Sequence, residues 1–161
     1  MKSIILKKLT APRPVIVSVD DALAKPAATD AEALKSFDAA WAKYLETYDR
    51  DGLPIRPGCA PVVFMVAPLA SVGLVAHVEN SIGRFGEHEL EMIAYSVVDI
   101  LNLVDEKNKP VAVVREKTPL GLRLPDDILM IFADDDVRRE VYAHCRKANQ
   151  LDAEVVKSSQ E

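Results

Sequence analysis

The stretch PGCAPVVFMVAPLASVGLVA, residues 57–76, decides the expected fold because it holds no charged residue over 20 positions. Within it, residues 62–66 form a continuous apolar run of strand length, which is typical of a strand buried on both faces of a sheet. Pro68 then suits the first turn of a helix. Prolines at 57, 61 and 68 would break a membrane-spanning helix. We therefore predict a buried strand followed by a helix, and no membrane segment.

Upstream of this stretch the sequence predicts one strand and one helix. Residues 15–19, VIVSV, are mostly β-branched and indicate a strand. Thr29 and Glu32 have the spacing of a capping box, which places the start of a helix there. Apolar residues recur at three- and four-residue steps as far as Tyr48. Gly52 is expected to end this helix in the left-handed conformation.

Downstream, the sequence predicts a turn at residues 83–86, a strand at residues 111–114 and three helices. The first helix carries its apolar residues on one face, at Leu90, Ile93, Ala94, Val97, Val98, Leu101 and Val104. Pro125 suits the start of a second, short helix. Asp134, Asp135 and Asp136 should end it and cap the last helix. The buried stripe of that last helix is expected at Val137, Val141, Cys145 and Ala148.

Together these elements predict a helix-rich α+β fold, with a small β-sheet packed against four or five helices. The sheet is expected to combine residues 15–19, 62–66 and 111–114. A chain of 161 residues suits a single domain, which we place at residues 1–150. Residues 151–161 are polar and are expected to form a flexible C-terminal tail.

Composition excludes several classes of function. The formal net charge is -5, and an acidic chain is a poor partner for nucleic acid, whose binding depends on concentrated positive charge. Two cysteines are too few for a disulfide framework, and the N-terminus lacks the apolar core of a secretory signal. The expected location is therefore the cytoplasm.

Few residues are candidates for catalysis. Cys145 follows His144 directly, but neighbouring residues on a helix point about 100° apart, so the two would not share a proton. Cys59 has no base near it in the sequence, although His77 or His88 could reach it in the fold. These side chains lack the CxxC or HxxxH spacing of a zinc site.

The acidic residues Asp126, Asp127, Asp134, Asp135 and Asp136 offer oxygen ligands for Mg²⁺ or Ca²⁺ but lack the spacing of a calcium loop. Helix capping accounts for every one of these positions. We predict no catalytic residue, no metal site and no cofactor. A small enzyme that uses Cys59 or this acidic cluster remains the alternative hypothesis, and a regulatory or host-interaction module is a third.

Four aromatic residues share one face of the first predicted helix, namely Phe37, Trp41, Tyr44 and Tyr48. Aromatic side chains are frequent in both cores and interfaces, and a tyrosine hydroxyl tolerates water. We therefore assign Phe37 and Trp41 to the core, and Tyr44 and Tyr48 to a candidate partner-binding surface. The partner is expected to be a second copy of the chain or a long helical protein.

The order of features in residues 61–161 resembles that of the small tail-assembly chaperones of long-tailed bacteriophages. An apolar strand leads into a helix (PVVFMVAPLASVGLVAHV), and an amphipathic helix follows (HELEMIAYSVVDILNLV). A turn opens into a strand with charged flanks (DEKNKPVAVVRE), and a Leu-Pro-Asp helix start comes next (LRLPDDILMIF). The chain ends in a polar tail (RKANQLDAEVVKSSQE).

This resemblance implies a non-enzymatic protein that coats and solubilises the tape-measure protein of a phage tail, in the cytoplasm of the host bacterium. The tape-measure protein is a long, apolar helical chain, and a grooved apolar surface on a soluble protein would shield it. The family has no catalytic residues to carry over to this sequence.

Overall fold

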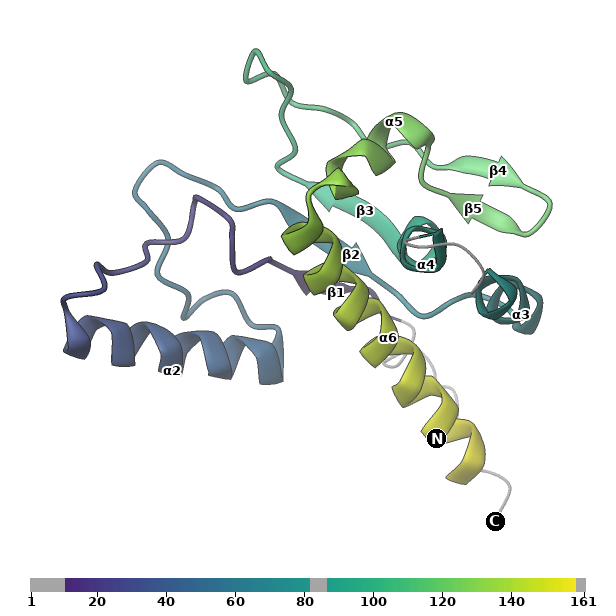
Figure 1. Cartoon of the computed structure of the whole chain (residues 1–161), viewed down its shortest axis with the longest axis horizontal. Coiled ribbons are helices and arrows are strands. Elements are labelled where there is room, and N and C mark those ends of the chain that lie inside the picture. The colour runs from purple at the N-terminus through teal and green to yellow at the C-terminus, as the bar shows by residue number, and fades with distance from the viewer. Residues whose placement is uncertain (1–10, 82–86, 159–161) are drawn as a thin grey trace.

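The structure is a computed structural model that describes residues 11–81 and 87–158 (Figure 1). Its main sheet is antiparallel, in the order β1-β2-β3, with β1 at Arg13–Val15, β2 at Val63–Val66 and β3 at Val97–Leu101. A separate hairpin pairs β4 (Glu116–Thr118) with β5 (Gly121–Arg123). The helices are α2 (Ala31–Thr47), α3 (Val72–Asn80), α4 (Glu87–Ser96), α5 (Asp126–Leu129), the 3-10 helix η1 (Met130–Ala133) and α6 (Asp135–Ser158). The predicted single-domain α+β class with a small sheet is confirmed.

The sheet is buried on both faces. Phe64 and Val66 of β2 point into one hydrophobic cluster, and Val63 points into another. The first cluster lies against α3, α4, η1 and α6, whereas the second lies against α2. Figure 1 shows α6 crossing the sheet and α2 at the far end of the molecule. The prediction that residues 62–66 form a strand buried on both faces is therefore confirmed. A helix follows the strand as predicted, but α3 begins at Val72 after the N-cap Ser71, and Pro68 is not in its first turn.

The third strand of the sheet is not the predicted one. Residues 97–101 were expected to continue the helix of residues 90–104, but α4 ends at Ser96 and the chain enters β3 at once. Phe64 pairs with Ile100 in the ladder, and the register shifts at Val66, which pairs with Val97. Valine and isoleucine tolerate both states, and a long-range partner in the ladder outweighs their weak helix propensity.

The predicted strand at residues 111–114 lies outside both sheets. The N–H of Val111 donates to the carbonyl of Leu103 at 2.9 Å, after which the segment has no ladder partner in the described part of the chain. Its side chains alternate: Val111 and Val113 pack against the core, while Val114 is exposed. The strand predicted at residues 15–19 is also misplaced, because β1 spans Arg13–Val15 and shares only Val15 with the predicted range.

Helix ends also differ from the predicted ones. Asp30 caps α2, since its carboxylate accepts the N–H of Ala33 at 3.0 Å, so Thr29 is not the N-cap. At the other end Tyr48 takes the left-handed conformation at φ 54°, four residues before Gly52. Asp134 does cap α6, where it accepts the N–H groups of Asp136 and Val137.

The last helix extends into the predicted C-terminal tail. α6 runs as far as Ser158, so its backbone is helical through most of the segment 151–161 that was expected to be a flexible tail. The predicted turn at residues 83–86 and residues 159–161 lie outside the described residues.

Candidate functional site

Tyr44 is a core residue and does not form a contact surface. Its side chain is 1% exposed, and its hydroxyl accepts the N–H of Ile16 at 2.6 Å and donates to the carbonyl of Pro14 at 2.8 Å. Burial raises the pKa of Tyr44 to about 12. The assignment of Tyr44 to a partner-binding surface is thus corrected: its hydroxyl is bonded to the backbone next to β1 and not to solvent.

Tyr48 is half-buried and also has partners inside the protein. Its hydroxyl forms a hydrogen bond with Nδ1 of His144 at 2.9 Å. The guanidinium of Arg13 and the ammonium of Lys147 lie over its ring, at 5.5 Å and 5.7 Å from the centroid. Phe37 and Trp41, which were assigned to the core, are only partly buried. The two tyrosines therefore join the C-terminal end of α2 to β1 and α6.

The two cysteines have opposite environments. Both are free thiols, with Cys59 exposed and Cys145 buried. Burial raises the pKa of the Cys145 thiol to about 12, which suppresses the reactive thiolate. The neighbouring His144 uses its Nδ1 atom in a hydrogen bond with the hydroxyl of Tyr48.

Three of the five acidic residues of the predicted cluster, Asp126, Asp134 and Asp135, have structural roles. Asp126 and Asp135 form ion pairs with Arg123 and Arg138, and Asp134 caps α6. Within the described residues no group of three or more His, Cys, Asp or Glu side chains could hold a metal ion. The structure does not bring the acidic residues together as a ligand set.

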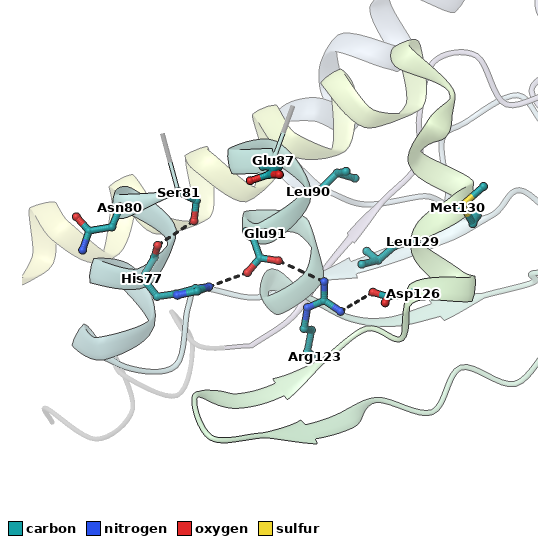
Figure 2. A pocket seen from close by; sticks show the side chains of 10 residues that line it. All are labelled: His77, Asn80, Ser81, Glu87, Leu90, Glu91, Arg123, Asp126, Leu129 and Met130. Atoms are coloured by element: carbon teal, nitrogen blue, oxygen red, sulfur yellow. Dashed lines mark hydrogen bonds and ion pairs between the residues drawn. The ribbon is translucent and has the colours of Figure 1, made fainter. Parts of the chain in front are cut away.

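An open groove lies between α3, α4, β5 and the α5–η1 segment, with a volume of about 710 Å³. We call it the α3–α4–α5 groove. It is lined by His77, Asn80, Ser81, Glu87, Leu90, Glu91, Arg123, Asp126, Leu129 and Met130. Its apolar part comes from α4 and from the α5–η1 segment, where Met130 is 71% exposed. Figure 2 shows these apolar side chains above a chain of polar groups.

Polar side chains link the walls of the groove. Nε2 of His77 on α3 lies 2.8 Å from a carboxylate oxygen of Glu91 on α4. The other oxygen of Glu91 lies 3.2 Å from the guanidinium of Arg123, which also pairs with Asp126 at 2.8 Å (Figure 2). Burial lowers the pKa of Arg123, but the hydrogen bonds and charges of Asp126 and Glu91 outweigh burial. The pKa of Arg123 is therefore raised. These contacts run from α3 to α5 and fix the shape of the groove.

The sequence contained little signal for this groove. Its lining comes from five separate elements, and none of its polar residues falls in a recognisable motif. Met130 lies in the apolar run ILMIF, residues 128–132. A methionine in the run ILMIF is usual in a core, so only the structure showed it to be exposed.

No protein-family model, curated protein or solved structure matches this chain. Within the described residues, none of the helices has both the length and the apolar character needed to span a bilayer.

Proposed function

We propose that this protein is a non-enzymatic accessory protein that binds and solubilises a helical partner chain. The α3–α4–α5 groove is the observation that carries this proposal. It is open, and it presents Leu90, Leu129 and the exposed Met130 beside polar walls. An amphipathic helix binds in such a groove by placing its apolar face on the apolar side chains. Methionine adapts its shape to different partners and is common at surfaces that bind several related helices.

The phage tail-assembly chaperones that residues 61–161 resemble supply the proposed partner. We propose a tape-measure protein, which is long, helical and apolar, as the chain that the groove receives. The proposed compartment is then the cytoplasm of the host bacterium, where such tails are assembled.

Fewer observations support the enzyme hypothesis. Cys145 is buried with a raised pKa, and Asp126, Asp134 and Asp135 serve ion pairs or a helix cap. Cys59 is exposed, but the structure gives it no hydrogen-bonded base among the described residues. No specific observation favours a catalytic role, so we do not propose one.

The experiment is co-expression with a candidate tape-measure protein, encoded by a long open reading frame beside the gene. We expect the partner to be insoluble alone, and soluble and co-eluting in the presence of wild-type protein. Met130→Asp places a charge among the apolar side chains of the groove and should abolish this effect. Met130→Leu keeps the apolar contact and should retain it.

If the partner stays insoluble with folded wild-type protein, it is not the client. If Met130→Asp solubilises the partner as well as wild type does, the groove is not the binding site. Circular dichroism of both variants checks that the fold is intact.

A further inference from the structure

We propose that the N-terminal segment, residues 1–10, packs against the C-terminal turns of α6 in the same chain. This docking is independent of the α3–α4–α5 groove and of its proposed partner. Four features of the chain support it: the place where β1 begins, the direction of β1, the apolar row of α6, and the charges of the two segments. The apolar run of the N-terminal segment is Ile4, Ile5 and Leu6, and the matching positions on α6 are Leu151 and Val155.

β1 begins beside the second half of α6. The guanidinium of Arg13 and the ammonium of Lys147 lie over the same ring, that of Tyr48, at 5.5 Å and 5.7 Å from its centroid. The hydroxyl of Tyr48 also forms a hydrogen bond with His144 of α6. Arg13 and residues 144–147 therefore meet at one aromatic side chain, so the segment that precedes Arg13 starts next to α6.

The direction of β1 leads the preceding segment toward the end of α6. Arg13 pairs with Val66 in an antiparallel ladder, so the chain before Arg13 runs the same way as the chain after Val66. After Val66 the chain reaches Leu69, whose N–H donates to Oδ1 of Asn149 at 2.9 Å. Ten residues can span about 33 Å when extended. Residues 151–158 add only about 12 Å to the length of α6, so the segment is long enough to follow them.

α6 carries apolar positions beyond the core that it packs against. Cys145 and Ala148 are buried in the first hydrophobic cluster, and Leu151 and Val155 continue their row at steps of three and four residues. Figure 1 shows the last turns of α6 projecting past the sheet and the other helices. A helix gains most of its stability from the packing of its apolar face. A segment that covers this row would therefore stabilise the helical backbone that reaches Ser158.

The two segments carry opposite charges. Residues 1–10 contain three basic residues and no acidic one, whereas residues 151–161 contain three acidic residues and one basic one. Opposite charges favour this pairing and fix its register. Because β1 holds the segment beside α6, its effective concentration there is in the millimolar range, which favours the segment of the same chain over that of a second copy. The basic residues are Lys2, Lys7 and Lys8, and the acidic ones are Asp152, Glu154 and Glu161.

Hydrogen exchange of the full chain, followed by mass spectrometry, tests the apolar contact. Ile5→Ser combined with Leu6→Ser should make the amides of residues 151–158 exchange about tenfold faster than in wild type. Ile5→Val combined with Leu6→Met keeps the apolar surface and should leave this exchange unchanged. The amides of β2 report in the same spectra whether the fold is intact. Exchange of residues 151–158 that is equal in wild type and in the serine variant would overturn the docking.

A reversal of charge keeps the test decisive if the serine variant disturbs β2. Lys7→Glu combined with Lys8→Glu should speed the exchange of residues 151–158 about threefold, because like charges then face each other. In a protein that carries Asp152→Lys and Glu154→Lys, the same N-terminal change should instead slow it, because opposite charges are restored. An effect of the same sign in both backgrounds would contradict the pairing.

The dependence on concentration identifies the chain that supplies the segment. Protection of residues 151–158 should be the same at about 2 μM and about 200 μM protein, because docking within one chain does not depend on concentration. Protection that increases with concentration would assign the contact to a second copy and overturn docking within the same chain.

Discussion

The hydroxyl of Tyr44 caps the backbone where β1 ends. β1 is an edge strand of the sheet, and such an edge exposes backbone groups that can pair with other chains. Tyr44 bonds to the carbonyl of Pro14 and to the N–H of Ile16, so a side chain replaces the next ladder partner. Glu140 does the same for the N–H of Ser18, at 2.6 Å. Side chains thus occupy the N–H groups of Ile16 and Ser18, in the segment 15–19 where the β-branched sequence predicted a strand.

We expect Tyr44→Phe to destabilise the protein by about 1–3 kcal/mol, because it leaves the buried N–H of Ile16 without its partner. Urea denaturation measures this change in the free energy of unfolding. Tyr142→Phe, which removes a hydroxyl from a half-buried tyrosine of α6, is the matched control and should cost less. An equal loss in the two variants would show that the bonds of Tyr44 contribute nothing specific.

His144 makes stability depend on pH. Burial lowers its pKa from the ordinary 6.5, and the charge of Lys147 lowers it further. The unfolded chain then binds a proton more tightly than the folded protein. The contribution of neutral His144 is therefore complete above about pH 6.5 and is lost as pH falls through the lower folded pKa.

We expect the free energy of unfolding of wild type to decrease between about pH 7 and pH 5, and His144→Gln to show a smaller decrease. Urea denaturation at each pH measures both. Carboxylates titrate mainly below this interval. The difference between the two slopes isolates His144, because all other titrating groups are common to both proteins. Identical slopes for the two proteins would contradict the role assigned to His144.

At the scale of elements, the change from α4 to β3 determines the shape of the sheet. α4 ends at Ser96, and Val97 continues directly as β3. Val97 is fully buried and pairs with Val66, whereas Val98 lies at the register shift and is only half-buried. In the predicted continuous helix, Val97 and Val98 would both face the core. In the strand, only Val97 is fully buried.

Val97→Asp should cost about 3–5 kcal/mol, since it buries a charge without a partner. That loss is a large part of the stability of an ordinary domain, so the melting temperature should fall sharply or the protein should not fold. Val114→Asp introduces the same charge at a residue that is 74% exposed and should shift the melting temperature little. Similar effects of the two substitutions would place Val97 outside the core.

At the scale of the whole molecule, the sheet is a layer between two hydrophobic clusters. β2 is its central strand, and its side chains contact both clusters. Residues 111–115, in contrast, are extended but belong to neither sheet. Local stability should therefore differ strongly between these two segments.

Hydrogen exchange followed by mass spectrometry should find the slowest exchange in β2 and fast exchange in residues 111–115. The amides of β2 open only with the ladders on both sides, whereas the extended segment lacks such ladders. Equal protection of the two segments would show that residues 111–115 are paired with a partner strand, as in a dimer.

The sequence by itself determined the central strand, the first helix and the last helix. Each has a signal within a few residues: the uncharged run around Phe64, the apolar periodicity up to Tyr48, and the capping acid Asp134 before α6. Burial of a continuous apolar run and capping of a helix end depend mainly on neighbours in the chain, so local patterns suffice for them.

Only the tertiary structure decided the third strand, the burial of Tyr44 and the groove. Residues 97–101 fit a helix by periodicity, but a ladder with β2, more than 30 residues away in sequence, makes them a strand. The Tyr44 hydroxyl is buried because the backbone next to β1 offers it two bonds. The groove is built from side chains of α3, α4, β5, α5 and η1. Contacts between residues so distant in sequence leave no periodic or local signal, because they form only when the chain has folded.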